Sequence, residues 1–192
     1  MPRRVTTVVV CGPSGVGKTT IGRLLAEEFQ CPFVEGDDYH SAENVEKMRA
    51  GTPLTDEDRI PWLHRLFDEV IAPNSGKDGV SVSLACSALR RRYRDILRGA
   101  DHCHTAAGRR KQLPETEVFF LLLCGDAGVV ASRLAARKGH YMPPSLLASQ
   151  LATLEALAPD ELGATADLSE SPEVIAKKAA KLVRMVTAPS TL

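Results

Sequence analysis

One eight-residue stretch of the sequence has glycines, a lysine and a threonine at a spacing that suits phosphate binding. Residues 12–19 read Gly-Pro-Ser-Gly-Val-Gly-Lys-Thr and match the pattern G-x-x-x-x-G-K-[ST]. Glycines let backbone N–H groups surround an anion, Lys18 can reach the β and γ phosphates, and the Thr19 hydroxyl can ligate Mg²⁺. The pattern predicts a nucleotide site. We expect the nucleotide to contact Gly12, Pro13, Ser14, Gly15, Val16, Gly17, Lys18, Thr19 and Thr20.

Acidic residues occur at the end of a short strand-like segment, 33–35. Glu35 and Asp37 are two residues apart, and side chains at this spacing in an extended segment point to the same side. One acid could hold a Mg²⁺-bound water while the other accepts a proton from an attacking hydroxyl, the two tasks that phosphoryl transfer leaves to the protein. An acidic turn exposed to solvent is the alternative, and the nearby phosphate-binding pattern favours the metal and base interpretation.

Two arginines, Arg133 and Arg137, lie four residues apart in a helical pattern. This spacing puts both guanidinium groups on one helix face, where they can bind the phosphates of ATP. The following residues, 138–144, read Lys-Gly-His-Tyr-Met-Pro-Pro and are typical of a hinge and cap. A lid of this kind would exclude water from the reaction. A basic helix face exposed to solvent is the alternative.

Strand-like and helix-like segments alternate along the chain, which predicts an α/β fold with a parallel sheet and crossover helices. The strand-like segments are 5–11, 33–35, 80–86, 118–124 and 166–168. Apolar residues at helical spacing follow each of them. We expect Pro61 to begin the helix after the second strand and Asp126 to cap the helix after the fourth, which would end at Gly139. The last helix should begin at Ser171-Pro172-Glu173 and turn Ile175, Ala179, Leu182 and Val186 inward.

Composition excludes several classes of function. The 192 residues carry 24 Lys+Arg and 24 Asp+Glu, so no net charge favours nucleic acid or an anionic membrane as a partner. The apolar runs are shorter than the roughly 20 residues that cross a bilayer. The N-K-x-D motif of guanine-nucleotide switches is also missing, because its nearest string, 74–78, has an extra residue. Residues 101–114 lack apolar periodicity and should form a surface loop.

The cysteines bear on where the protein is located. Five cysteines, an odd number with no C-x-x-C pair, indicate reduced thiols. The apolar run that follows Arg3-Arg4 lacks the small-residue cleavage site of a signal peptide, so we expect the protein in the cytoplasm. The final Ser190-Thr191-Leu192 is similar to a peroxisomal tripeptide without its central basic residue, so a peroxisome-like organelle is the alternative location.

Beyond these patterns, the chain resembles the gluconokinase family, small sugar-acid kinases related to shikimate and nucleoside-monophosphate kinases. The resemblance covers nearly the whole length. It rests on residues 12–19, Gly-Asp-Asp-Tyr-His at 36–40, Gly-Thr-Pro-Leu-Thr-Asp-Glu-Asp-Arg-Ile-Pro-Trp-Leu at 51–63, Cys-Ser-Ala-Leu-Arg-Arg-Arg-Tyr-Arg-Asp at 86–95 and Ala-Arg-Lys-Gly-His-Tyr-Met at 136–142. The D-x-D-R-x-P-W-L and C-S-A-L blocks are far more selective than the phosphate-binding turn.

The resemblance implies an activity and an architecture. The reaction would be phosphorylation of D-gluconate to 6-phosphogluconate by ATP with Mg²⁺. The fold would be a single P-loop domain, 1–192, of three αβα layers around a five-stranded parallel sheet of order 2-3-1-4-5. A substrate-side segment would span about 37–72 and a small helical lid about 133–150. A homodimer is also implied.

The resemblance further assigns roles to residues. Asp37 matches the second acid of the family's acid-x-acid motif and would be the base or the hydroxyl anchor, while Glu35 stands where Asp is usual and would support the metal. Lys18 and Arg133 would join Asp37 in catalysis. We expect the substrate to contact Asp37, His40, Arg59 and His140.

Alternatives to these interpretations remain open. An ion pair of Arg59 with Asp56 or Glu57 would give that arginine a structural role, and His40 could be structural as well. Trp62 is expected to pack in the core. The protein could also be another small-molecule kinase of this fold, such as a shikimate kinase, or a nucleotide-gated binding protein that transfers no phosphate.

Overall fold

A five-stranded parallel sheet forms the centre of the computed structural model, which describes residues 4–100, 104–105, 108–109, 117–136 and 146–187. The strands are β1 (Val5–Cys11), β2 (Phe33–Glu35), β3 (Val82–Ala85), β6 (Glu117–Cys124) and β7 (Gly163–Asp167). They lie in the order β2-β3-β1-β6-β7, and every neighbouring pair is parallel. Counted along the chain this is the order 2-3-1-4-5, so the expected sheet is confirmed.

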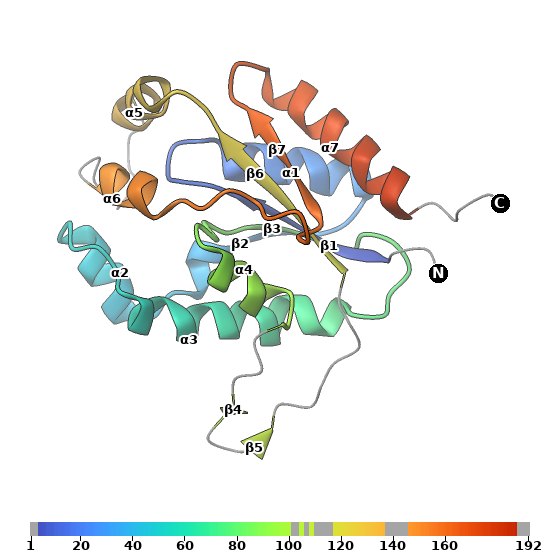
Figure 1. Ribbon diagram of the computed structural model, residues 1–192, viewed down its shortest axis with the longest axis horizontal. Coiled ribbons are helices and arrows are strands. Elements are labelled where there is room, and N and C mark those ends of the chain that lie inside the picture. The colour runs from blue at the N-terminus through green and yellow to red at the C-terminus, as the bar shows by residue number, and fades with distance from the viewer. Residues whose placement is uncertain (1–3, 101–103, 106–107, 110–116, 137–145, 188–192) are drawn as a thin grey trace.

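Helices cover both faces of the sheet (Figure 1). Helices α1 (Lys18–Phe29) and α7 (Pro172–Thr187) lie on one face, and α3 (Asp56–Leu66) and α4 (Arg91–Leu97) lie on the other. The central strand β1 is buried along its whole length because its side chains alternate between two apolar clusters. Val8 and Val10 join the cluster under α1 and α7, whereas Val9 and Cys11 join the cluster under α3 and α4. The three-layer αβα architecture is therefore as expected.

Three further helices gather near the edge of the sheet where the strands end (Figure 1). They are α2 (Ala42–Arg49), α5 (Ala127–Ala136) and α6 (Leu146–Thr153). Short helical turns follow β2 and α3, namely η1 (Gly36–Tyr39), η2 (Phe67–Ile71) and η3 (Ala72–Asn74). Strands β4 (His104–Thr105) and β5 (Gly108–Arg109) form a small antiparallel hairpin within the segment expected to be a surface loop. In the described parts of the chain, no helix is long and apolar enough to span a membrane.

Helix α3 begins at Asp56 and not at Pro61, which lies inside the helix. The prediction was wrong because a capping box fixes an earlier start. The Thr55 hydroxyl accepts a hydrogen bond from the Asp58 N–H at 3.3 Å, and the Asp58 carboxylate accepts one from the Thr55 N–H at 2.9 Å. The acidic first turn, which contains Glu57, also interacts favourably with the positive end of the helix dipole.

The last helix begins at Pro172, and the hydroxyl of Ser171 accepts a hydrogen bond from the N–H of Val174, so the expected start is confirmed. Its inward face differs from the prediction at one position. Leu182 is 40% exposed, whereas Val183 is buried at 1%. The buried stripe moves by three or four residues per turn, and the next inward position after Ala179 and Ala180 is therefore 183.

The start of α5 was predicted from the sequence, and the start of β7 was not. The Asp126 carboxylate accepts hydrogen bonds from the N–H groups of Gly128 and Val129, which confirms the cap of α5, and Gly139 lies outside the described residues. Strand β7 starts earlier than expected and ends at Asp167. A Cβ atom at Gly163 would lie only 2.3 Å from the Phe120 carbonyl oxygen, so glycine permits this close pairing with β6.

Candidate active site

The phosphate-binding pattern forms a tight loop between β1 and α1. Gly12, Gly15 and Gly17 have φ angles of 132°, 86° and 92°, in the region that favours glycine. A Cβ atom at Gly12 would also lie 2.6 Å from the Leu123 carbonyl oxygen. The glycines are therefore required by the loop geometry. Thr20 is exposed on α1, and its predicted contact with the nucleotide stays a prediction.

Lys18 folds back across this loop. Its Nζ donates a hydrogen bond to the Pro13 carbonyl oxygen at 2.9 Å. Burial lowers the pKa of Lys18, and the nearby carboxylates of Asp37 and Glu35 oppose this effect. The lysine thus lies within electrostatic reach of both acids that the sequence singled out.

Thr19 and Glu35, the two residues predicted to hold a metal, are brought together. The Thr19 hydroxyl donates a hydrogen bond to Glu35 Oε2 at 2.7 Å. Burial raises the pKa of Glu35, and the hydrogen bond from Thr19 opposes the rise. Their oxygens are the hard ligands that Mg²⁺ prefers. The described residues form no cluster of three or more His, Cys, Asp or Glu that could hold a metal, and a magnesium site fits here because this ion takes few protein ligands and keeps water and phosphate oxygens.

The turn η1 carries the second acid. A Cβ atom at Gly36 would lie 2.4 Å from the carbonyl oxygen of Ala85, so only glycine lets the chain leave β2 this close to the end of β3. The next residue, Asp37, lines a pocket together with Lys18. Glu35 and Asp37 therefore differ in placement. Glu35 is bonded to the loop threonine, and Asp37 faces the pocket.

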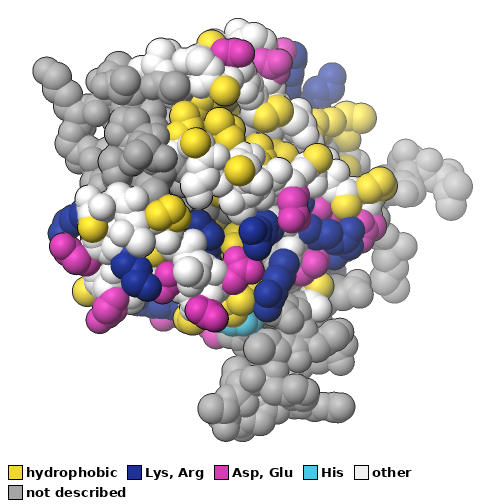
Figure 2. All heavy atoms as spheres, turned by 60° about the vertical axis from the view of Figure 1, so that its left-hand side comes forward, with side chains coloured by type: hydrophobic (Ala, Val, Ile, Leu, Met, Phe, Trp, Pro, Cys, Tyr) yellow, Lys and Arg dark blue, Asp and Glu magenta, His cyan; other side chains and the backbone are white. Residues whose placement is uncertain are grey.

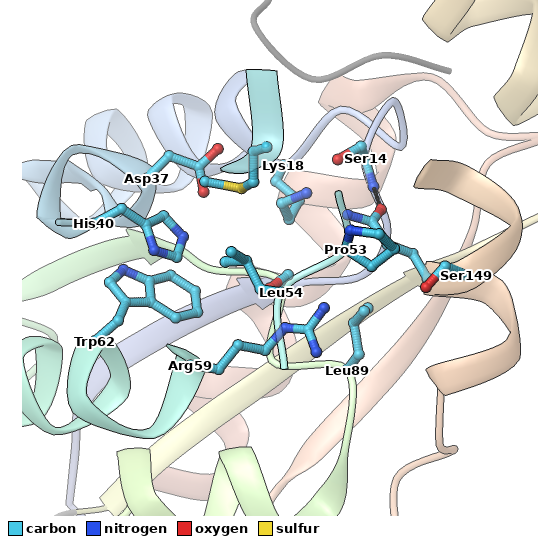
Figure 3. Close-up of a pocket in the computed structure, with 13 residues that line it drawn as sticks. Ser14, Lys18, Asp37, His40, Pro53, Leu54, Arg59, Trp62, Leu89 and Ser149 are labelled. Carbon is cyan, nitrogen blue, oxygen red and sulfur yellow. Dashed lines mark hydrogen bonds between the residues drawn. The ribbon is translucent and has the colours of Figure 1, made fainter. Parts of the chain in front are cut away.

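This pocket joins the phosphate-binding loop to the substrate-side segment (Figure 3). It is lined by Ser14, Lys18, Asp37, His40, Met48, Pro53, Leu54, Arg59, Trp62, Ser87, Leu89, Ser149 and Gln150. Asp37 and Lys18 lie on one side of it, and Arg59 lies on the opposite side. A small molecule in this pocket would contact the loop that holds the phosphates, which is the arrangement that phosphoryl transfer requires.

His40 is stacked on Trp62 at the edge of the pocket. The ring centroids are 4.0 Å apart, and the Trp62 Nε1–H donates a hydrogen bond to the Gly36 carbonyl oxygen at 2.8 Å. Trp62 is 4% exposed and belongs to an apolar cluster, so its expected packing role is confirmed. Burial lowers the pKa of His40 to about 4, with a further lowering by Arg59 and an opposing effect of Asp37. His40 is therefore neutral near pH 7 and can hydrogen-bond a hydroxyl.

Arg59 does not form the structural ion pair considered as its alternative role. Within the described part of the chain, its guanidinium has no carboxylate partner within 4.0 Å, and its Nη1 donates to the Tyr93 hydroxyl at 3.4 Å. Asp56 pairs instead with Arg90 at 3.2 Å and Arg92 at 3.7 Å. Arg59 thus keeps its charge available to the pocket.

Two further residues that line the pocket, Ser149 and Gln150, were not predicted from the sequence. The Ser14 N–H donates a hydrogen bond to Gln150 Oε1 at 2.7 Å, and the Gly12 N–H donates to the Ser87 carbonyl oxygen at 3.0 Å. Gln150 is buried, and Ser149 beside it also lines the pocket. The contact between Ser14 and Gln150 spans 136 positions. No local pattern reports such a contact.

The predicted lid is only partly described. Arg133 belongs to α5, and its side chain lies outside the description. Arg137 and His140 lie outside the described residues. Contacts of these three residues with phosphate or substrate therefore stay predictions. On the face of the molecule shown in Figure 2, basic and acidic side chains lie next to one another.

Of the five cysteines, Cys11, Cys31, Cys86 and Cys124 are free, and Cys103 lies outside the described residues. Burial raises the pKa of Cys11 to about 12 and also raises that of Cys86. These two thiols are therefore inert at neutral pH, although both lie near Lys18.

The sheet order, the glycine-rich loop and the adjoining pocket define this protein as a P-loop kinase. The family described as AAA domain matches residues 8–157. A gluconokinase from Arabidopsis thaliana is 40% identical over 181 residues, which cover 92% of this chain and 91% of that protein. Given this identity and coverage, the chain belongs to the gluconokinase family.

Solved structures agree with this family. A sugar kinase from Janibacter is 42% identical and has a TM-score of 0.77, with 96% of this chain and 99% of that chain covered. A gluconokinase from Sinorhizobium meliloti is 35% identical and has a TM-score of 0.75, with 96% and 95% covered. The likeness therefore extends over the whole fold and includes both sides of the pocket.

Proposed function

We propose that this protein transfers the γ-phosphoryl group of ATP to gluconate and forms 6-phosphogluconate. The observation that carries the proposal is the shared pocket, in which Lys18 and Ser14 of the phosphate-binding loop lie beside Asp37 and Arg59. Membership of the gluconokinase family supports the choice of acceptor. A gluconate molecule has its carboxylate and its phosphorylated hydroxyl at opposite ends, and the pocket has Arg59 and Asp37 on opposite sides.

The donor side of the pocket binds and orients ATP. Backbone N–H groups of residues 12–19 and the Lys18 ammonium would hold the β and γ phosphates. Thr19 and Glu35 would hold Mg²⁺, which when bound neutralises charge on the phosphate oxygens. Arg133 and Arg137 would add positive charge from the lid as the phosphoryl group moves.

The acceptor side positions gluconate. Asp37 would accept a hydrogen bond from the reacting hydroxyl and take its proton as the new P–O bond forms. Arg59 would bind the carboxylate, because a planar guanidinium suits a planar anion. The neutral imidazole of His40 would hydrogen-bond a hydroxyl of the chain, and His140 would close over the substrate.

A panel of acceptors tests this proposal. We expect ADP release with Mg²⁺ and ATP to be fast with gluconate and slow with shikimate, with glucose or with no acceptor. Glucose has no carboxylate for Arg59, and the ring of shikimate holds its carboxylate closer to its hydroxyl groups than the open chain of gluconate does. Faster turnover with shikimate would contradict the choice of acceptor. ATP binding with no acceptor-dependent turnover at all would favour a nucleotide-gated binding protein.

The assembly and location of the protein also belong to this proposal. We propose a homodimer, which the family resemblance supports, and a cytoplasmic location, which the four free cysteines support. Light scattering on the purified protein tests the first, because a monomeric mass across micromolar concentrations would contradict it.

A further inference from the structure

An arginine that binds the carboxylate of an acceptor has to meet two demands. It must be held in one orientation, because ordering a free side chain on binding costs conformational entropy. It must also keep its charge, because an ion pair with a resident carboxylate would first have to be broken. Arg59 lines the pocket and, within the described part of the chain, has no such carboxylate partner. The second demand is therefore met.

Tyr93 on α4 meets the first demand. Tyr93 is 1% exposed, and it is not among the residues that line the pocket. The Tyr93 hydroxyl accepts a hydrogen bond from Arg59 Nη1 at 3.4 Å, and Arg59 Cζ lies 5.8 Å from the centre of the Tyr93 ring. A phenol oxygen and an aromatic face hold a guanidinium without cancelling its charge.

Asp56 fixes the direction in which the Tyr93 hydroxyl points. The hydroxyl has one proton and donates it to Asp56 Oδ1 at 2.5 Å, so its lone pairs remain for Arg59. This hydrogen bond holds the pKa of Asp56 below its usual range. Burial and the same hydrogen bond raise the pKa of Tyr93, so the phenol keeps its proton at neutral pH.

Two other arginines occupy Asp56, so that it does not form an ion pair with Arg59. Arg90 Nη1 lies 3.2 Å from both oxygens of Asp56, and Arg92 Nη1 lies 3.7 Å from one of them. Asp56 and Arg59 are three residues apart on α3, a spacing at which an acid and an arginine often pair. In this protein Asp56 interacts with Arg90, Arg92 and the Tyr93 hydroxyl. Arg59 lines the pocket instead.

We propose that Tyr93, oriented by Asp56, is a positioning residue that fixes the Arg59 guanidinium for the carboxylate of the acceptor and so makes the pocket selective for acidic over neutral polyols. This rests on the proposed function, because it takes Arg59 as the residue that binds the carboxylate of gluconate. Arg59 lies across the pocket from Asp37 (Figure 3), so it would set the end of the acceptor that is not phosphorylated.

The variant Tyr93→Phe tests the proposal because it keeps the ring and removes the hydroxyl. We expect its KM for gluconate to rise about five- to tenfold, the effect of a typical rather than a strong hydrogen bond, since the bond that orients Arg59 is long at 3.4 Å and does not touch the acceptor itself. Its kcat and its KM for ATP should stay within about twofold, because the phosphate side is untouched. The preference for gluconate over sorbitol, measured as a ratio of kcat/KM values, should fall by the same factor as gluconate kcat/KM.

A matched control is Tyr39→Phe, which removes a phenol hydroxyl outside the pocket, from a ring that faces Arg65. Its kinetic constants should equal those of the unchanged protein. An unaltered KM for gluconate in Tyr93→Phe would overturn the proposal. An equal rise in the KM values for gluconate and ATP would also overturn it, because it would show a merely structural role.

The variant Arg59→Met separates this proposal from the proposed function. It should raise the KM for gluconate more than Tyr93→Phe does, and adding Tyr93→Phe to it should have no further effect. If Arg59→Met leaves the KM for gluconate unchanged, the carboxylate site itself is wrong. If Arg59→Met raises the KM and Tyr93→Phe does not, the carboxylate site stands and the positioning role of Tyr93 is wrong.

Discussion

At the scale of single residues, the pocket combines groups whose charge is set by their surroundings. His40 lies against Trp62, and burial lowers its pKa to about 4, so it stays neutral where a free histidine would begin to charge. The charge of Asp37 raises the pKa of His40, and the charge of Arg59 lowers it. A neutral imidazole can donate and accept a hydrogen bond at once. That property suits recognition of a polyhydroxy acceptor.

The pKa of His40 has a consequence for stability. In the unfolded chain this histidine takes up a proton below about pH 6.5, whereas in the folded protein it does so only near 4. Its contribution to stability is therefore complete above pH 6.5 and is lost as the pH falls toward 4. Between these values, the unfolding free energy should fall more steeply than in His40→Gln, by up to about 1.4 kcal/mol per pH unit.

Urea unfolding at a series of pH values measures this difference. The protein has one tryptophan, Trp62, and its fluorescence reports directly on the stack with His40. Parallel pH curves for the two proteins would mean that His40 is not held neutral by the fold.

At the scale of elements, a buried ion pair joins two segments that line or adjoin the pocket. The side chains of Arg94 on α4 and of Glu161 are both 0% exposed, and Arg94 Nε lies 2.6 Å from Glu161 Oε1. The same guanidinium donates hydrogen bonds to the carbonyl oxygens of Ala88, Leu89, Glu155 and Ala156. It therefore ties the turn after β3 to the chain that follows α6. Ala88 has a φ of 40°, an uncommon value for a residue other than glycine, and Arg94 holds its carbonyl.

Removal of Arg94 should destabilise the protein strongly. We expect Arg94→Met to lower the unfolding free energy by about 3–5 kcal/mol, because Glu161 would remain buried without its partner. The control is Arg91→Met, which breaks an exposed pair with Asp160 and should cost less than about 1 kcal/mol. Urea denaturation of both variants measures the contrast. Equal losses of unfolding free energy in the two variants would show that the buried pair contributes no more to stability than the exposed one.

At the scale of the whole molecule, local sequence patterns predicted the loops, strands and helices better than they predicted contacts between distant segments. The loop at 12–19 was readable because its eight residues are contiguous. The rule that strand ends carry functional groups singled out Glu35, and the structure places Glu35 in a hydrogen bond with Thr19. Alternation of strands and helices indicated the fold class, and the family resemblance added the strand order. The start of α3 was missed because the preference of Pro61 for a helix start was placed above the capping box at Thr55.

The contacts that could not be predicted are those between segments far apart in the chain. Arg94 and Glu161 are 67 positions apart, and Tyr93 and Asp56 are 37 apart. In the sequence, each of these residues has the appearance of an ordinary charged or aromatic position. Only the packing of α4 against α3 and against the chain after α6 gives them partners.

The most direct test is to identify the product of the reaction and to show that its formation depends on the carboxylate of Asp37. Phosphorus NMR of the purified protein with ATP, Mg²⁺ and gluconate should show one 6-phosphogluconate for each ADP. In Asp37→Asn the rate should fall about a hundredfold or more, because the base that takes the hydroxyl proton is lost. The neighbouring exposed acid offers a control, and Asp38→Asn should keep its activity. ADP formed without 6-phosphogluconate, or full activity in Asp37→Asn, would contradict the account.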